Sequence, residues 1–389
     1  MKKYFRLIIL FLIISSSNNY VYAKSDLKIG AFLPLSGKHG LIGNSIYQSI
    51  LVTIFELENL NIKIIPLDTE STRNGAVNAF KKGLNQKVDI FVGPIFHKTI
   101  NDIKNVEGFK NKLFISYSNK EKNIYNNVIN FGVNLTSQIN AIKKYFNRKD
   151  KFIFFGDNTD FTKKVFNSTK KFKSKKKNSI FYKDFKDINY QIKKITNFQA
   201  RNKSHLSKIK KLQKLYDESV SNNSESLSDK EIIENMKKHD TSEKVSFNKV
   251  LISSFNEELI ASISYFDFYD ANYKDVQFLT LNLWFNKKYL IEPSLQNIIF
   301  PSISYNGYKE LNEKYQKNFG KDIYHLEALT FDMIPLIAST WFSIKDLKLK
   351  ASMFNGSYKG KTGNFTIKEN KTYRKLFLYK IVDKKFKKI

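Results

Sequence analysis

The order of short apolar segments along the chain constrains its fold more than any other feature of the sequence. Runs that are apolar at nearly every position alternate with stretches whose apolar residues recur at helical spacing. The strand-like runs of the first third are residues 27–34, 62–68, 89–94 and 112–118, and the helical stretches are 44–58 and 74–85. Strands without polar alternation are typical of a sheet buried on both faces, and alternation with helices is typical of parallel strands. We therefore predict an α/β fold.

A second series of strand-like runs follows the first. It comprises residues 151–157, 179–185, 249–254 and 276–282. Two consecutive α/β series in one chain predict two similar lobes rather than one large sheet.

The segment from residue 192 to about 244 departs from this pattern. Leu206, Ile209, Leu212 and Tyr216 share one helical face, and "SDKE" from Ser228 has the spacing of a capping box that opens a second helix. We predict a charged helical hairpin inserted in the second lobe. It is either a solvated decoration or a docking surface for a partner.

The first 23 residues have the pattern of a secretory signal. A basic start precedes the apolar run "LIILFLII", and "VYA" places Val21 and Ala23 at −3 and −1 of a cleavage site. The apolar run is too short to span a bilayer, which takes about 20 residues. We expect an exported protein, and an uncleaved membrane anchor is the alternative.

Cysteine usage and charge exclude several classes of function. The chain has no cysteine, which excludes disulfides, thiolate metal sites, a cysteine nucleophile and the lipid-attachment cysteine of an exported lipoprotein. Its net charge of +30 suits anionic partners in general. The lysines are nevertheless spread along the chain, apart from the dense run 170–177, and no nucleic-acid recognition motif accompanies them. We expect no nucleic-acid binding.

The loop "LPLSGKHGLIGNS", residues 33–45, superficially resembles a phosphate-binding loop. Gly37 and Gly43 are six residues apart instead of five, and Asn44 stands where that motif needs lysine. We interpret the loop as a strand-to-helix turn in which the glycines permit a tight backbone and Asn44 caps the helix. Its helix N-terminus would favour an anionic group.

Other chemical motifs are weak. The histidines have no second metal ligand at helical or turn spacing, and we expect no metal site and no cofactor. They are His39, His97, His205, His239 and His325. "GDNTD", with Asp157, is interpreted as a loop cap rather than a calcium loop. "SKIK" at 207–210 and "KTG" at 361–363 match two fragments of the serine β-lactamase motif set, so a hydrolase remains a third hypothesis. We expect no enzyme.

Several segments resemble the type I periplasmic binding proteins, the fold of branched-chain amino-acid receptors. "KIGAFLPLSG", "DIFVGPIF" and "LFISYSN" resemble the cleft-forming strand ends of the first lobe. "FFGDNTDFTKKVF", residues 154–166, resembles the first strand, loop and helix of the second lobe. The resemblance covers most of the chain. It implies two lobes joined by hinge strands, with a ligand cleft at the carboxyl ends of the strands.

Within that fold the second half is most similar to the penicillin-binding protein activators. Residues 195–212 resemble their inserted helix, 278–302 their strand, tryptophan loop and return strand, 329–339 their late helix and 354–381 their closing strands. The boundaries that we expect are a signal peptide at 1–23, lobe 1 at 25–131 and 304–350, lobe 2 at 132–303 and 351–389, and the helical insertion at about 196–245.

The resemblance assigns a set of residues to the cleft. The candidates are Ser36, Gly37, Phe96, His97, Ser116, Ser118, Asp157, Phe161 and Trp284. Each of them could instead be a loop cap or a packed aromatic. Amino-acid receptors typically offer a small hydroxyl after the third strand, where this chain has Phe96 and His97, and this departure argues against an α-amino acid.

Two functions follow as expectations. The first is a non-enzymatic periplasmic protein that regulates peptidoglycan synthesis by contact with a cell-wall synthase, a penicillin-binding protein. The alternative is a solute receptor that delivers an amino acid or small amide to an ABC permease. In both cases we expect a protein that is soluble after cleavage of its signal, with possible ligand binding between the lobes.

Overall fold

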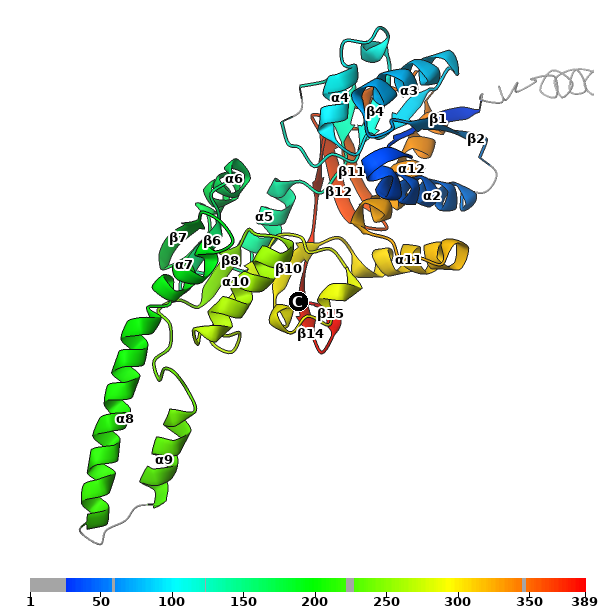
Figure 1. Cartoon of the computed structure of the whole chain (residues 1–389). Helices are drawn as coiled ribbons and strands as arrows, with labels where there is room; N and C mark the ends of the chain where they lie inside the picture. The colour runs from blue at the N-terminus through cyan, green and yellow to red at the C-terminus, as the bar shows by residue number, and fades with distance from the viewer. Residues whose placement is uncertain (1–25, 58–59, 123, 222–226, 345–347) are drawn as a thin grey trace, which may run out of the picture.

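Two sheets, each covered by helices, form the two lobes of the molecule (Figure 1). This computed structural model describes residues 26–57, 60–122, 124–221, 227–344 and 348–389. The expected signal peptide at 1–23 lies outside the described residues. No helix among the described residues is long and apolar enough to cross a membrane.

The eight-stranded sheet of lobe 1 has the order β11-β12-β13-β5-β4-β3-β1-β2. Its strands are β1 (Leu27–Leu33), β2 (Ile62–Asp68), β3 (Ile90–Val92), β4 (Leu113–Ser116), β5 (Val128–Asn130), β11 (Gly356–Gly360), β12 (Gly363–Lys368) and β13 (Lys371–Arg374). The helices of this lobe are α2 (Gly40–Phe55), α3 (Arg73–Asn85), α4 (His97–Ile103), α11 (Tyr305–Phe319) and α12 (His325–Ser343), with short 3-10 turns at Gly37–His39, Phe109–Asn111 and Ala351–Phe354. The first five strands run parallel. The sequence predicted the first four as a parallel series, whereas β5 was not predicted.

The seven-stranded sheet of lobe 2 has the order β15-β14-β10-β9-β8-β6-β7. Its strands are β6 (Lys151–Asp157), β7 (Lys176–Tyr182), β8 (Lys249–Ile252), β9 (Gln277–Thr280), β10 (Ile299–Ser302), β14 (Phe377–Val382) and β15 (Lys385–Lys388). The helices are α5 (Leu135–Lys143), α6 (Asp160–Thr169), α7 (Asp187–Ile195), α8 (Phe198–Ser221), α9 (Leu227–Lys237) and α10 (Asn256–Phe268), with 3-10 turns at Lys287–Tyr289 and Pro293–Leu295.

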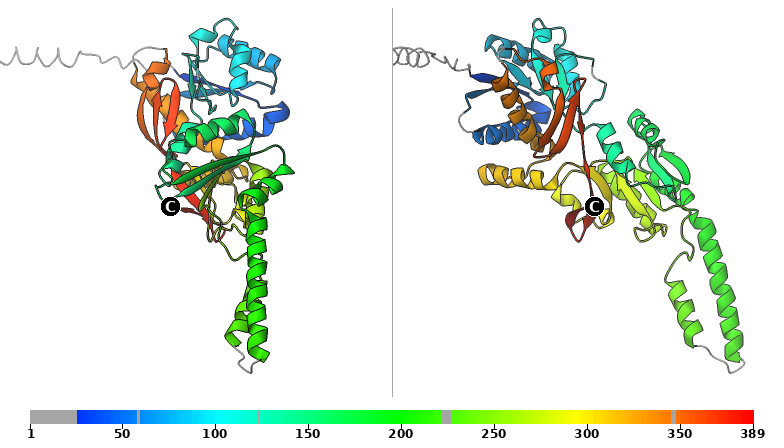
Figure 2. Two further views of the ribbon diagram at one scale, coloured as in Figure 1. Left: turned by 90° about the vertical axis from the view of Figure 1, so that its left-hand side faces the viewer. Right: turned by 180° about the vertical axis from the view of Figure 1, so that it is seen from behind.

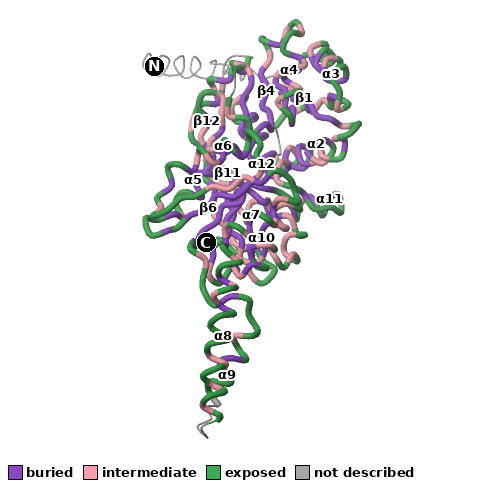
Figure 3. Tube along the Cα trace, turned by 60° about the vertical axis from the view of Figure 1, so that its left-hand side comes forward, coloured by how far each residue is buried: buried purple, intermediate pink, exposed green. Residues whose placement is uncertain are grey.

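Burial on both faces explains why the central strands lack polar alternation. Every residue of β3, β4 and β8 is buried, so the side chains on both faces of these strands are covered. In lobe 1, α12 is apolar almost all round and packs against α2. Figure 3 shows the buried positions gathered along the strands of each lobe. Continuous apolar runs of this kind are the signature of parallel sheets covered by helices on both faces.

The closing strands are antiparallel hairpins, which the prediction of purely parallel sheets did not include. β12 and β13 are joined by Glu369 and Asn370 with φ of 51° and 59°, and β14 and β15 by Asp383 and Lys384 with φ of 52° and 55°. Two consecutive residues with positive φ form a type I′ turn, whose twist matches that of the flanking strands.

Three chain segments cross between the lobes: β5 to α5, β10 to α11, and β13 to β14. Our expected boundary at residue 351 differs from this arrangement. β13 pairs in parallel with β5, and the backbone N–H of Asn130 donates to the carbonyl of Asn370 at 2.9 Å. Strands β11–β13 are therefore part of the lobe 1 sheet, and the chain enters lobe 2 only after Arg374.

Arg374 fixes the third crossing segment from inside the molecule. Its guanidinium donates to the Thr362 hydroxyl at 3.0 Å and to the carbonyl of Phe131 at 3.2 Å, and pairs with Asp332 of α12 at 3.4 Å. The rings of Phe131 and Phe365 lie 4.6 and 5.0 Å from it. Because Phe131 belongs to the first crossing segment, one side chain joins two of the three.

The predicted hairpin is present and projects from lobe 2 as an arm, defined here as α8 and α9 (Figures 1 and 2). Ile233 is buried between the two helices, whereas Leu206, Leu215 and Ile232 are at least half exposed. Most of the arm is exposed along its length (Figure 3). The arm therefore covers little of the rest of the molecule.

Candidate functional site

A cavity of about 520 Å³ lies between the lobes, at the carboxyl ends of the parallel strands. Lobe 1 contributes the loops after β3 and β4 and the start of α12, and lobe 2 contributes α5, α6 and the loops after β8 and β9. The lining residues are Ile95, Phe96, His97, Tyr117, Ser118, Asn119, Lys120, Glu121, Val133, Leu135, Gln138, Phe161, Lys164, Phe255, Leu281, Asn282, Trp284, His325 and Leu326. Both the position and the volume are typical of ligand sites in α/β proteins.

Five of the nine residues expected at the cleft line this cavity. They are Phe96, His97, Ser118, Phe161 and Trp284. The Phe161 ring lies 6.1 Å from that of Phe255, so two aromatic side chains of lobe 2 are adjacent at the cavity. Whether these residues contact a ligand stays a prediction.

Ser116 and Asp157 do not line the cavity, because both bind their own loops. The hydroxyl of Ser116, buried at the end of β4, donates to the carbonyl of Pro94 at 2.8 Å and accepts from the Ser118 N–H at 3.1 Å. The carboxylate of Asp157 accepts from the N–H and hydroxyl of Thr159 and from the hydroxyl of Thr162. These bonds confirm the interpretation of "GDNTD" as a loop cap.

Ser36 and Gly37 also lie outside the cavity lining, in the turn between β1 and α2. The N–H of Ser36 donates to Asp68 at 3.1 Å, and Gly37 has φ of 73° against the backbone of Glu70. The predicted tight backbone is confirmed at Gly43, where an added Cβ would lie 1.8 Å from the carbonyl oxygen of Pro34.

The expectation that Asn44 caps the helix is wrong, because α2 begins earlier, at Gly40. Asn44 lies in the second turn, and its amide donates to the carbonyls of Leu35 at 2.6 Å and Gly40 at 2.8 Å. An N-cap side chain accepts hydrogen bonds from backbone N–H groups, whereas the Asn44 amide donates to backbone carbonyls and so holds the loop against the helix. The loop meets the cleft through His39, whose ring lies 4.6 Å from Phe96.

The charges of the cavity come mainly from residues that sequence reasoning missed. Lys164 of α6 pairs with Glu121 of lobe 1 at 2.8 Å, so an ion pair crosses between the lobes. Burial raises the pKa of Glu121, but hydrogen bonds from Lys164 and Thr136 outweigh it and hold the pKa below its usual range. Burial, assisted by the charge of Lys120, lowers the pKa of His97. We therefore expect His97 to be neutral at pH 7.

A second contact between the lobes is the stack of Trp284 on His325, with ring centroids 3.3 Å apart and planes 12° from parallel. Trp284 has φ of 55°, uncommon for a large side chain, and its N–H donates to Asn282 at 2.8 Å. Loss of hydration lowers the pKa of His325 to about 3. The stack is also one wall of an adjoining groove of about 490 Å³ that α2 and the loop before α12 complete.

The two β-lactamase-like fragments do not form a common site. Residues 207–210 lie in α8 of the arm, whereas 361–363 form the turn between β11 and β12 in lobe 1. There Lys361 pairs with Glu310 at 2.8 Å and Thr362 binds Asp332. Among the described residues, no three histidine or acidic side chains gather as a metal site would require.

Comparison with known sequences gives no match: no family model fits the chain, and no curated protein matches it. Solved structures do match over nearly its whole length. A putative branched-chain amino acid ABC transporter protein from Rhodospirillum rubrum superposes with a TM-score of 0.67 at 11% identity, covering 94% of this chain and 100% of the other. The amino acid binding protein LivJ of Streptococcus pneumoniae, in complex with isoleucine, gives 0.58 at 16% identity, with coverage of 93% and 98%.

The C-domain of LpoA from Haemophilus influenzae, described as a regulator of PBP1A, superposes as well as LivJ does. Its TM-score is 0.58 at 12% identity, and the match covers 93% of this chain and 99% of that domain. The chain spans 59% of full-length LpoA. At such identities the likeness extends to the fold alone. The chain has the two-lobed fold of type I periplasmic binding proteins, which an amino acid transporter's substrate binding protein and a regulator of PBP1A share.

Proposed function

We propose that this protein is a non-enzymatic, exported regulator of peptidoglycan synthesis that acts in the periplasm by contact with a penicillin-binding protein. The observation that carries the proposal is the arm. It is fixed at its base, projects from lobe 2 (Figure 2) and is exposed over most of its length (Figure 3), as a contact surface must be.

Arg201 fixes the base of the arm. Its guanidinium, 5% exposed, donates to the carbonyls of Glu243 at 2.8 Å and Tyr269 at 3.1 Å and to the Thr241 hydroxyl at 2.7 Å. His205 of α8 forms a hydrogen bond with Ser242 in the segment that follows α9. A loop decoration without function would not need a buried cation with this many partners, because burying a charge is costly unless it is fully hydrogen-bonded.

The contacts across the cleft support the same proposal. The stack of Trp284 on His325 and the ion pair of Lys164 with Glu121 join the lobes through the protein's own side chains. The hydroxyl of Ser116 is engaged by its own loop. The regulator LpoA shares the fold.

Replacement of residues 207–235 by a short Gly–Ser linker tests the proposal while retaining Arg201 and Thr241. We expect the full protein to bind a purified bifunctional penicillin-binding protein and to change its rate of glycan polymerisation, and the shortened protein to do neither. Biolayer interferometry and a polymerisation assay measure the two effects. Equal activity of the shortened protein would contradict a contact through the arm.

Point substitutions separate the arm from the surface of lobe 2. Leu206→Ser with Ile232→Ser removes two half-exposed apolar side chains of the arm, and Tyr190→Ser with Phe268→Ser removes two aromatic side chains that are somewhat more exposed from α7 and α10. We expect the first pair to weaken synthase binding by at least fivefold and the second to leave it within twofold. Equal losses in both would indicate non-specific adhesion.

The cavity itself favours a second candidate, a solute receptor for an ABC transporter. Its volume of about 520 Å³ lies within the range of small-molecule sites, and Lys120, His97 and Ser118 line it. These groups suit an anionic or amide-bearing solute. Closure of the two lobes over that solute would be the mechanism.

Calorimetry with a panel of amino acids, amides and aromatic carboxylates distinguishes the two functions. Tight binding that Trp284→Ala abolishes, together with no synthase binding, would establish the receptor and overturn the regulator.

A further inference from the structure

A larger cavity, of about 640 Å³, lies on lobe 1 at the opposite ends of the strands from the cleft. Lys112 and Leu113, at the amino end of β4, line this cavity, whereas Tyr117 and Ser118, at its carboxyl end, line the cleft. The lining residues are Lys104, Asn105, Phe109, Lys110, Asn111, Lys112, Leu113, Ile124, Tyr125, Asn126, Asn127, Lys348, Leu349, Lys350 and Ala351. We call it the lysine cavity.

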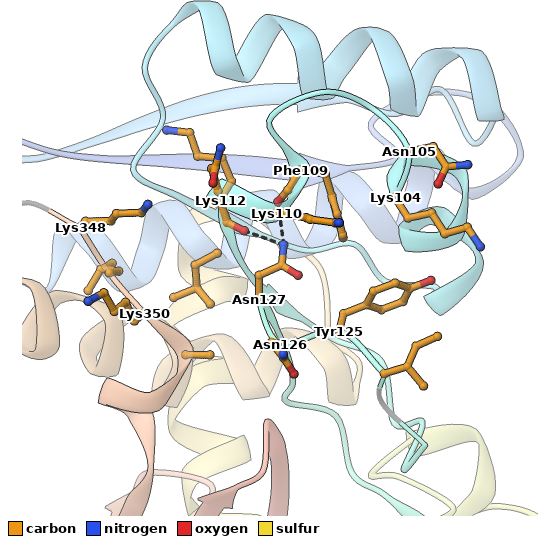
Figure 4. Close-up of a pocket in the computed structure, with 15 residues that line it drawn as sticks. Lys104, Asn105, Phe109, Lys110, Lys112, Tyr125, Asn126, Asn127, Lys348 and Lys350 are labelled. Atoms are coloured by element: carbon orange, nitrogen blue, oxygen red, sulfur yellow. Dashed lines mark hydrogen bonds between the residues drawn. The ribbon is translucent and has the colours of Figure 1, made fainter.

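Five lysines from two stretches of chain, residues 104–112 and 348–350, line this cavity, and no aspartate or glutamate does. Figure 4 shows Lys348 and Lys350 on one side, Lys104 on the opposite side, and Lys110 and Lys112 between them. Chain neighbours alone do not produce such a cluster, because the chain between α12 and β11 meets the segment before β4 only in the folded protein. The fold therefore concentrates positive charge at one concave place.

Several lysines elsewhere on the surface have acidic partners. Lys361 pairs with Glu310 at 2.8 Å and Lys287 with Asp322 at 2.9 Å. In the lysine cavity, the Lys112 ammonium donates to the carbonyl of Val88 at 2.5 Å. Among the described residues, none of the five cavity lysines has a carboxylate within ion-pair distance, so an added anion would be their counter-charge.

The ammonium groups are close enough to affect one another. Burial lowers the pKa of Lys112, Asp89 opposes this, and the charge of Lys348 lowers the pKa further. An anion placed between Lys112 and Lys348 would remove that repulsion. The gain would grow with the charge of the anion, because each unit of charge interacts with several ammonium groups.

The uncharged walls are fixed and partly apolar. The Asn127 amide donates to the carbonyls of Phe109 at 2.7 Å and Lys112 at 2.9 Å, which holds the segment before β5 against that before β4 (Figure 4). Ile124 is exposed at the rim. The cavity thus offers lysine ammonium groups beside an apolar edge, and lysine is a common ligand of phosphate.

We propose that the lysine cavity binds a phosphate group that carries at least two negative charges, in a free polyphosphate or in the headgroup of a lipid. The site goes beyond the proposed regulator and does not depend on it, because the arm and the cleft contribute no residue. A phosphate suits it better than a single carboxylate, since lysines on opposite sides can then contact different oxygens of one ligand.

The experiment compares two charge-matched variants of the whole protein. Lys110→Gln with Lys348→Gln removes two charges from the cavity. Lys173→Gln with Lys176→Gln removes two from the dense run 170–177, also exposed, in lobe 2. Calorimetry with inorganic pyrophosphate and co-sedimentation with vesicles that contain phosphatidic acid, a lipid whose headgroup is a doubly ionisable phosphomonoester, measure binding, each at two salt concentrations.

We expect the cavity pair to weaken binding at least tenfold and the control pair to change it less than twofold. Pyrophosphate binding with that pattern identifies a free phosphate as sufficient, and the same pattern with vesicles alone identifies a lipid headgroup. Equal losses in the two pairs would overturn the proposal in favour of general electrostatic attraction, and so would the absence of binding to both probes. Neither result bears on synthase binding by the arm.

Discussion

Replacement of Arg374 by methionine tests how the crossing segments are held together. The substitution keeps an unbranched side chain of similar reach but removes the guanidinium. It thereby removes the hydrogen bonds to Thr362 and the Phe131 carbonyl and the pairing with Asp332. Asp332, whose side chain is fully buried, is left as a carboxylate without a cation.

The expected loss of stability is large for a single residue. Removing one partner of a buried ion pair typically costs about 3–5 kcal/mol, because the remaining charge is buried without compensation. Here the side chains are 2% and 0% exposed, so water cannot take the place of the guanidinium. We therefore expect about 3–5 kcal/mol at pH 8.

The loss should depend on pH in a defined direction. Burial raises the pKa of Asp332 even in the intact pair, where Arg374 opposes it, and loss of Arg374 raises it further. A carboxyl whose pKa is raised on folding stabilises the fold below its unfolded pKa, and this contribution is lost as the pH rises through the folded pKa. The difference between variant and wild type should therefore shrink from pH 8 to pH 5, by up to about 1.4 kcal/mol for each unit of additional pKa shift.

Urea unfolding followed by tryptophan fluorescence measures these changes, since Trp341 is buried in the same helix as Asp332. The control is Asp332→Asn with Arg374→Met, which removes both charges and should recover most of the stability at pH 8. The reasoning is refuted if Arg374→Met costs less than about 1 kcal/mol, below the range for a broken buried pair, or if the double variant is no more stable than the single one.

Trp284→Ala should raise the pKa of His325 from about 3 toward that of a free histidine, because water replaces the indole ring. An NMR titration would measure this pKa, and an unchanged value would show that other groups desolvate His325. In the wild type, the lowered pKa predicts a loss of stability as the pH falls from about 6.5 toward 3, since only the unfolded state takes up the proton in that range. Lys249→Met should destabilise lobe 2 by about 3–5 kcal/mol, because it leaves the buried carboxylate of Asp150, 2.9 Å from the Lys249 ammonium in the wild type, without a cation. Urea unfolding would measure the loss, and Asp150→Asn in the same chain should restore much of the stability. Gly43→Ala should lower the thermal midpoint by several degrees, since its Cβ would overlap a backbone carbonyl; an unchanged midpoint would mean that the turn before α2 shifts freely.

The sequence predicted the parallel strands well because their signal is local. β2 and β6 have the bounds that their apolar runs predict. β6 is buried along most of its length, and a strand buried on both faces admits few polar residues. β2 is an edge strand in which only Leu67 is buried. The hairpins β12–β13 and β14–β15 were missed. Their turns use Glu-Asn and Asp-Lys in place of the glycine-containing pairs by which such turns are usually recognised.

The composition of the cleft was less predictable than the fold. Phe96 and Trp284 could be placed at the cavity because each follows a recognisable strand. His325 and Lys164 begin or belong to helices, and nothing near them in sequence indicates that their side chains meet residues of the other lobe. Lys348 of the lysine cavity is similar: it was expected in lobe 1, but nothing near it in sequence indicates that it lines the same cavity as Lys112.

The arm also has a mechanical property. α8 has 24 residues, which at 1.5 Å each makes a rod about 36 Å long. A rigid rod magnifies rotation at its base: turning lobe 2 by about 10° about the crossing segments, a modest angle for hinged lobes, would sweep the far end of α8 through about 6 Å relative to its base. A small change in the angle between the lobes would thus be transmitted as a displacement of several ångströms at a distant surface.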